Sequence, residues 1–142
     1  MYRLMIVEDE QAIAQGIANS LPWEEWGFQI SRVCSNGEEA LEAIAVECPD
    51  LVLSDIRMPK MDGLELIRTL KEKNCPGEIL VLSNYEDFDP VRSALLLGAA
   101  DYLLKIKIQP DTLLACLNKT VEKLKDRAPR HLETEKKDQE EN

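Results

Sequence analysis

Short apolar runs alternate along this chain with segments in which apolar residues recur every three or four positions. Runs of strand length predict β-strands at residues 3–7, 28–33, 51–54, 78–83 and 101–105. The segments that follow each run predict helices with one buried face. Strands that alternate with helices predict an α/β fold, because each parallel strand pair needs a crossover connection, usually a helix. We therefore expect a parallel sheet covered by helices on both faces.

Local signals support the predicted helix boundaries. Asn36 with Glu39, and Asp62 with Glu65, have the spacing of capping pairs at helix starts. Gly98 suits the end of the fourth helix, because glycine readily takes the left-handed conformation found there. The predicted strands at 28–33 and 101–105 are the more polar ones, so we place them at the sheet edges. This favours a flavodoxin-like (βα)5 doubly wound sheet of order 2-1-3-4-5, with its ligand crevice beyond the carboxyl ends of the strands.

Chemically reactive side chains occur where the predicted strands end. They are Glu8 and Asp9 after the first strand, Asp55 after the third, Ser83 at the end of the fourth and Lys105 at the end of the fifth. The carboxyl ends of parallel strands share one edge of the sheet, so we expect these residues to converge. Three neighbouring carboxylates repel one another unless a cation is present, and Mg²⁺ prefers oxygen ligands. Asp55 could then attack phosphorus and form an acyl phosphate, which Ser83 would hydrogen-bond.

Each of these residues also has an ordinary structural explanation. Asp55 alone suits a turn or a helix N-cap, and Glu8 and Asp9 suit the positive end of a helix dipole. Lys105 alone suits a solvated position on an edge strand. Their occurrence together on successive strand ends is what indicates a reactive site.

Composition limits the functional classes. The chain has 142 residues, 44% of them hydrophobic, which is enough for one domain with its own core. Its formal net charge of -10 argues against direct binding to DNA, which relies on Lys and Arg contacts to phosphate. No apolar stretch has membrane-spanning length, and the N-terminal residues MYRLMIVEDE become acidic too early for a secretory signal, so we expect a cytoplasmic chain.

The four cysteines are widely spaced and the only histidine, His131, lies in the polar C-terminal segment. No CxxC pair occurs, which argues against a zinc site. We therefore predict reduced thiols in the core rather than a disulfide framework, for all four of Cys34, Cys48, Cys75 and Cys116.

Over residues 2–125 the sequence resembles the receiver domains of bacterial two-component response regulators. The segments that carry the resemblance are MYRLMIVEDE, SDIRMPKMDG and LSNYEDF; together with LPWEEWGF they are most similar to YesN-like regulators, in which the receiver precedes an AraC-type helix-turn-helix domain. The resemblance implies a receiver at 1–125 and, at 126–142, a charged tail or the start of a linker to an effector domain. It also implies transcription regulation, with DNA contacted only through that further domain.

The resemblance assigns a role to each candidate residue. It implies that Asp55 is the phosphoacceptor, that Glu8, Asp9, Asp55 and the backbone carbonyl of Arg57 hold Mg²⁺ or Mn²⁺, that Ser83 and Tyr102 are the switch residues, and that Lys105 pairs with the phosphoryl group. The implied phosphodonor is a phosphohistidine on a sensor histidine kinase. The domain would catalyse only its own phosphorylation and dephosphorylation. The implied homodimer face comprises the fourth helix, fifth strand and fifth helix.

Three positions depart from the family pattern. Glu8 stands where many receivers have Asp, a change of one methylene that metal ligation can absorb. Asn84 follows Ser83 where a small Gly or Ala is usual, and Ile106 follows Lys105 where proline is usual. A non-proline cis bond costs about 3 kcal/mol, so we expect a trans Lys105–Ile106 peptide. These departures leave open a pseudo-receiver that binds partners without phosphorylation. A phosphohydrolase with an aspartyl nucleophile is a further alternative, although it would need a second acid near the nucleophile and usually a cap.

Overall fold

The structure is a computed structural model, and it describes residues 1–84 and 86–127 apart from the side chains at positions 107, 126 and 127. Strands and helices alternate along the chain as the sequence pattern predicts. The elements are β1 (Tyr2–Val7), α1 (Gln11–Ser20), β2 (Phe28–Cys34), α2 (Gly37–Val46), β3 (Leu51–Asp55), α3 (Gly63–Glu72), β4 (Glu78–Ser83), α4 (Phe88–Leu97), β5 (Asp101–Leu104), the short 3₁₀ helix η1 (Lys105–Lys107) and α5 (Pro110–Arg127). Most of the predicted tail at 126–142 lies outside the described residues.

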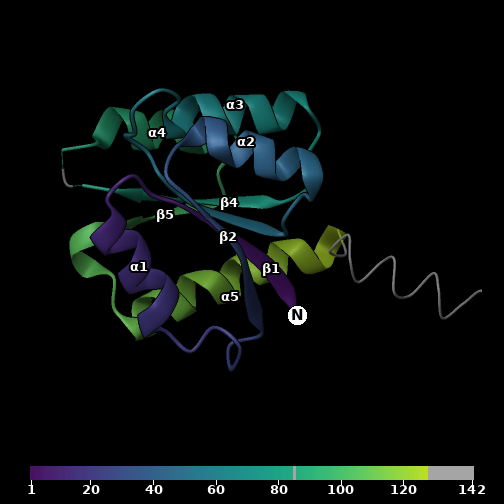
Figure 1. The fold of residues 1–142 in the computed structure, drawn as a ribbon, viewed down its shortest axis with the longest axis vertical. Helices are drawn as coiled ribbons and strands as arrows, with labels where there is room; N and C mark the ends of the chain where they lie inside the picture. Colours follow the sequence, from purple (N-terminus) through teal and green to yellow (C-terminus); the bar gives the residue numbers. More distant parts are fainter. Residues whose placement is uncertain (85, 128–142) are drawn as a thin grey trace, which may run out of the picture.

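The five strands form one parallel sheet of order β2-β1-β3-β4-β5, which confirms the predicted topology and both predicted edges. Figure 1 shows α2, α3 and α4 on one face of this sheet and α1 and α5 on the other. Alternate strand residues supply two cores. Val52 and Val81 pack with α2, α3 and α4, whereas Leu53 and Leu80 pack with α1 and α5. A sheet buried on both faces explains why the central strands are almost continuously apolar.

The register of the sheet brings the strand ends to one edge. Val7 pairs with Ser54, Asp55 pairs with Leu82, and the last pair of β4 and β5 joins Ser83 to Leu104. Glu8 and Asp9 therefore leave β1 one and two residues beyond its pairing with β3. This alignment positions the candidate site.

The predicted helix caps are present. The side chains of Asn36 and Asp62 accept hydrogen bonds from the backbone N–H groups of Glu39 and Glu65, both at 2.9 Å. Gly98 ends α4 with φ of 114°, in the left-handed region that favours glycine. These caps fix where α2, α3 and α4 begin or end, and so fix the loops at either end of the sheet.

The prediction of four free thiols is wrong for one pair. Cys48 and Cys75 form a disulfide across 27 positions of sequence, with Cα atoms 6.8 Å apart, whereas Cys34 and Cys116 are free and buried. Cys48 lies in the loop between α2 and β3, and Cys75 lies in the loop between α3 and β4. The two loops meet at the amino end of the sheet, where the Glu78 backbone N–H donates a hydrogen bond to the Asp50 carbonyl. The pairing depends on how these loops pack, so cysteine spacing alone could not predict it.

The fifth strand ends one residue earlier than predicted, at Leu104, and Lys105 opens η1. No cis peptide bond occurs among the described residues, so the Lys105–Ile106 bond is trans, as expected. Among the same residues, no helix is both long and apolar enough to cross a membrane.

Candidate functional site

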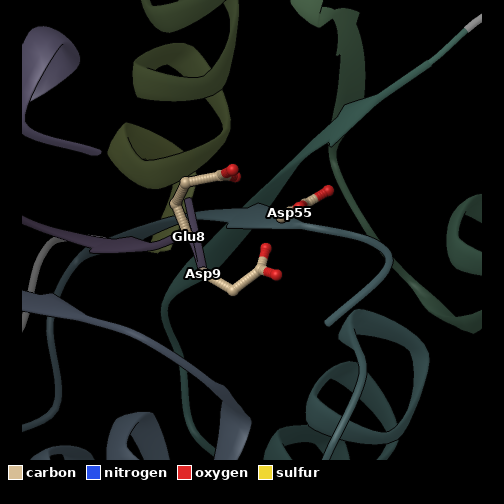
Figure 2. Close-up of side chains that lie close together, drawn as sticks. All are labelled: Glu8, Asp9 and Asp55. Carbon is tan, nitrogen blue, oxygen red and sulfur yellow. The ribbon is translucent and has the colours of Figure 1, made fainter. Parts of the chain in front are cut away.

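Three carboxylates meet at the carboxyl edge of the sheet. Glu8 and Asp9 follow β1, and Asp55 is the last residue of β3. One oxygen from each of the three side chains lies within 4.8 Å of the others. Figure 2 shows the three carboxylates facing a common space. Glu8 and Asp55 are buried and Asp9 is exposed, so the cluster has one side open to solvent.

Lys105 binds two of these acids directly. Its Nζ donates to Asp55 Oδ2 at 2.8 Å and to Glu8 Oε1 at 3.0 Å. Glu10, which the sequence analysis did not single out, lies 3.7 Å from the same nitrogen. Lys105 therefore occupies the predicted position beside the carboxylates, and its mostly buried side chain excludes the solvated alternative.

Burial and crowding change the protonation of the cluster. Burial, together with the charge of Asp55, raises the pKa of Glu8 from 4.5 to about 7. Burial also raises the pKa of Asp55, although Lys105 acts in the opposite direction. Burial alone would lower the pKa of Lys105, but its hydrogen bonds to Asp55 and Glu8 raise it overall, so this lysine stays charged. One cation thus holds two acids that repel each other.

Two buried polar atoms at this edge have no hydrogen-bond partner among the described residues: Glu8 Oε2 and Ser83 Oγ. Buried polar atoms are normally satisfied, so an orphaned one points to a group that binds there. Around Glu8 the donors are carboxylate oxygens, which suit a hard divalent cation such as Mg²⁺. The buried hydroxyl of Ser83 is available to donate a hydrogen bond to an oxyanion. The residues present therefore fit both a cation and a phosphoryl group.

Ser83 also borders an apolar hollow. The hollow has a volume of about 570 Å³ and lies between α4 and β5; its lining includes Ser83, Asn84, Val91, Leu95 and Tyr102. Tyr102 is 43% exposed. The two predicted switch residues thus line one hollow, beside the acidic cluster rather than inside it.

Arg57 and Asp87 connect two loops at this edge. The Arg57 backbone N–H lies 3.4 Å from Asp55 Oδ1, and its side chain forms an ion pair with Asp87. The other oxygen of Asp87 accepts the backbone N–H of Asn84 at 2.8 Å, and Asn84 itself is exposed. Sequence reasoning missed Asp87, because an Asp just before a helix is normally explained as its N-cap.

A family model described as the response regulator receiver domain matches residues 4–118. The transcriptional regulatory protein YesN of Bacillus subtilis is 36% identical over 105 residues, which cover 74% of this chain and 28% of that protein. The transcriptional regulatory protein HptR of Staphylococcus aureus is 33% identical over 105 residues, which cover 74% of this chain and 41% of HptR. The matched region thus spans less than half the length of these curated relatives.

Among solved structures, the receiver domain of AraT, a response regulator from Geobacillus stearothermophilus, superposes with a TM-score of 0.80 at 33% identity. The superposition covers 89% of this chain and 97% of that domain. Fold, strand-end chemistry and sequence similarity agree, and this chain belongs to the response regulator receiver domain family of two-component systems.

Proposed function

We propose that this receiver accepts a phosphoryl group on Asp55 from a phosphohistidine of a sensor histidine kinase. The observation that carries the proposal is one lysine that bridges two buried carboxylates: Lys105 Nζ lies 2.8 Å from Asp55 Oδ2 and 3.0 Å from Glu8 Oε1. Burying several carboxylates side by side costs more free energy than burying one, and a purely structural carboxylate gains nothing from acidic neighbours.

The transfer needs only a nucleophile and charge neutralisation. A carboxylate oxygen of Asp55 attacks phosphorus, the P–N bond of the phosphohistidine breaks, and its electron pair returns to the imidazole nitrogen. Lys105 stays charged and offers its ammonium group to the phosphoryl oxygens. Ser83 Oγ, buried and without a partner among the described residues, would donate to a phosphoryl oxygen once the group is in place.

Glu8, Asp9, Asp55 and the backbone carbonyl of Arg57 would hold Mg²⁺, or Mn²⁺ in its place. Bound there, the cation would offset the repulsion between the carboxylates and the incoming phosphoryl oxygens. The close approach of the three carboxylates and the orphaned Glu8 Oε2 support this assignment.

The surface formed by α4, β5 and α5 is the proposed output and dimerisation face. Phe88 and Leu96 are each 79% exposed there, and both line the same hollow as Ser83 and Tyr102. Large exposed apolar side chains grouped together favour a partner surface. We propose that phosphorylation draws Ser83 toward the phosphoryl group, turns Tyr102 inward and remodels this face for homodimer formation.

We further propose that the receiver, residues 1–125, acts in the cytoplasm and regulates transcription through a DNA-binding effector domain joined to it by the charged segment 126–142. The similarity to YesN and HptR, both named as transcriptional regulatory proteins, supports this role. The net charge of -10 fits a receiver that does not itself contact DNA. On this proposal the domain processes no substrate other than its own aspartyl phosphate.

Intact-mass spectrometry tests the proposal. The protein is incubated with Mg²⁺ and acetyl phosphate, alongside Asp55→Asn. We expect one phosphate adduct in the unmodified protein, loss of that adduct with hydroxylamine, and none in Asp55→Asn. An adduct of equal yield in Asp55→Asn would contradict the assignment of the nucleophile. No adduct in either protein would favour a pseudo-receiver.

A further inference from the structure

Asp87 occupies the N-cap position of α4 but does not cap that helix. No hydrogen bond from the helix reaches its side chain. One carboxylate oxygen instead pairs with the Arg57 guanidinium, and the other accepts the Asn84 backbone N–H at 2.8 Å. Its backbone carbonyl still accepts the Val91 N–H at 2.9 Å, so Asp87 is fixed to α4 as well. Asp87 therefore joins three segments, two through its side chain and the third through its backbone carbonyl.

Asp87 is buried, so losing these contacts would be energetically costly. Its side chain is 1% exposed, whereas that of Arg57 is 62% exposed. A buried carboxylate is costly unless it is paired and hydrogen-bonded. Burial alone would raise the pKa of Asp87, but the Asn84 N–H and the Arg57 guanidinium together lower it. The carboxylate thus stays charged, and moving either partner away would leave that charge unsatisfied.

The backbone of Arg57 contacts the proposed phosphoacceptor, Asp55. Its backbone N–H faces Asp55 Oδ1 at 3.4 Å. The preceding residue, Ile56, is fixed to β4 by its N–H bond to the Leu82 carbonyl at 3.1 Å. The loop that begins at Arg57 is therefore the first part of this edge able to respond when Asp55 changes. Asn84, held by the same Asp87, directly follows Ser83.

We propose that Asp87 is a positioning residue that couples the loop after the phosphoacceptor to the start of α4, through its contacts with Arg57 and Asn84. This inference rests on the proposed phosphorylation of Asp55. A change at Asp55 alters the position of Arg57, and the ion pair carries that change to Asn84, Ser83 and the first turn of α4. The coupling runs alongside the movements of Ser83 and Tyr102 and does not depend on them.

Backbone amide NMR with Mg²⁺ and beryllofluoride, a phosphoryl mimic, tests the coupling. In the unmodified protein we expect shifts at Arg57 and throughout α4. In Asp87→Asn we expect the Arg57 shift to persist and the mean shift over α4 to fall by at least half. Asp89→Asn, an exposed acid on the same helix, is the matched control and should behave like the unmodified protein.

The outcomes separate this inference from the proposed function. No shift at Arg57 in the unmodified protein would overturn the phosphoacceptor assignment, and the coupling with it. A full α4 response in Asp87→Asn would overturn the coupling alone. Arg57→Gln changes the exposed partner and should reproduce the loss in α4, which keeps the test valid if Asp87→Asn folds poorly.

A double-mutant cycle tests the ion pair without any phosphoryl mimic. Urea unfolding is measured for Arg57→Gln, Asp87→Asn and the double variant. We expect the effects on the unfolding equilibrium constant to depart from additivity by about fivefold or more, because charge-assisted pairs to a buried carboxylate are the strong ones. Additive effects would mean that the two side chains do not act together, and would contradict the proposal.

Discussion

Lys105 is the only cation that the described contacts place against both buried acids, Glu8 and Asp55. Removing one partner of a buried ion pair leaves the other charges uncompensated. We expect Lys105→Met, measured without divalent cations at pH 8, to lower the free energy of unfolding by about 3 kcal/mol. Urea denaturation followed by circular dichroism measures the change.

Lys119→Met is the matched control, because Lys119 is exposed on α5. It should change stability by no more than about 0.5 kcal/mol. Equal and small effects of the two substitutions would show that Lys105 contributes little to holding the acids together.

The raised pKa of Glu8 predicts that the free energy of unfolding, measured in EDTA, depends on pH. Because the pKa of Glu8 is raised from 4.5 to about 7 in the folded chain, the folded state binds more protons than the unfolded state between these values. Stability from this group is therefore present at low pH and is lost as pH rises through that window, by about 2 kcal/mol between pH 5 and 8. In Glu8→Gln, the free energy of unfolding should fall less between pH 5 and pH 8 than in the unmodified protein. An unchanged pH dependence would contradict the assignment of this effect to Glu8.

Among the elements, the turn from β3 to α3 leaves no room for a side chain at Gly63. A Cβ atom on Gly63 would lie 2.6 Å from the Asp55 carbonyl oxygen and 2.8 Å from Ile56 Cα, both backbone atoms that cannot move independently. We expect Gly63→Ala to destabilise the protein by about 2 kcal/mol and to slow phosphorylation by acetyl phosphate, because Asp55 must shift. Thermal unfolding and intact-mass kinetics measure the two effects.

Gly16 provides the control within α1. A Cβ there meets nothing within 4 Å, and Ala is the better helix former, so Gly16→Ala should stabilise by about 0.5–1 kcal/mol and leave phosphorylation unchanged. Comparable effects of the two substitutions would mean that close backbone approach at Gly63 is not what constrains the turn.

The disulfide connects the loops that follow α2 and α3. Closing a loop of 27 positions stabilises by about 3 kcal/mol in the chain-entropy model, so Cys48→Ser should lower Tm by roughly 10 °C.

Burial raises the pKa of Cys34 to about 11 and, with Asp101, that of Cys116 to about 12, so neither should be alkylated in the folded protein at pH 8. After unfolding without reductant, mass spectrometry should find these two thiols alkylated; four alkylated thiols would contradict the disulfide.

For the molecule as a whole, the sequence predicted the architecture well because local and global signals agree. The apolar runs mark strands buried on both faces, and caps such as Asn36 and Asp62 place the helices. Parallel topology then brings strand ends together, so the sequence pattern is enough to assign Glu8, Asp9, Asp55 and Lys105 to one site.

Contacts between loops could not be predicted in this way. The Cys48–Cys75 pair joins residues 27 positions apart and the Arg57–Asp87 pair joins residues 30 positions apart, and neither pair follows the helix or strand periodicity. Asp87 also has the sequence position of an N-cap, and only its orientation in the structure shows a different role. Side-chain direction in loops depends on tertiary packing, which hydrophobic periodicity does not encode.

The measurement that tests the central claim most directly is the location of the phosphoryl group. After reaction with Mg²⁺ and acetyl phosphate, borohydride reduction converts an aspartyl phosphate to homoserine, which tandem mass spectrometry places in the sequence. Our account predicts homoserine at position 55 and at no other acid of the cluster. Homoserine at position 8 or 9, or none at all where the intact mass carries a phosphate, would contradict Asp55 as the phosphoacceptor.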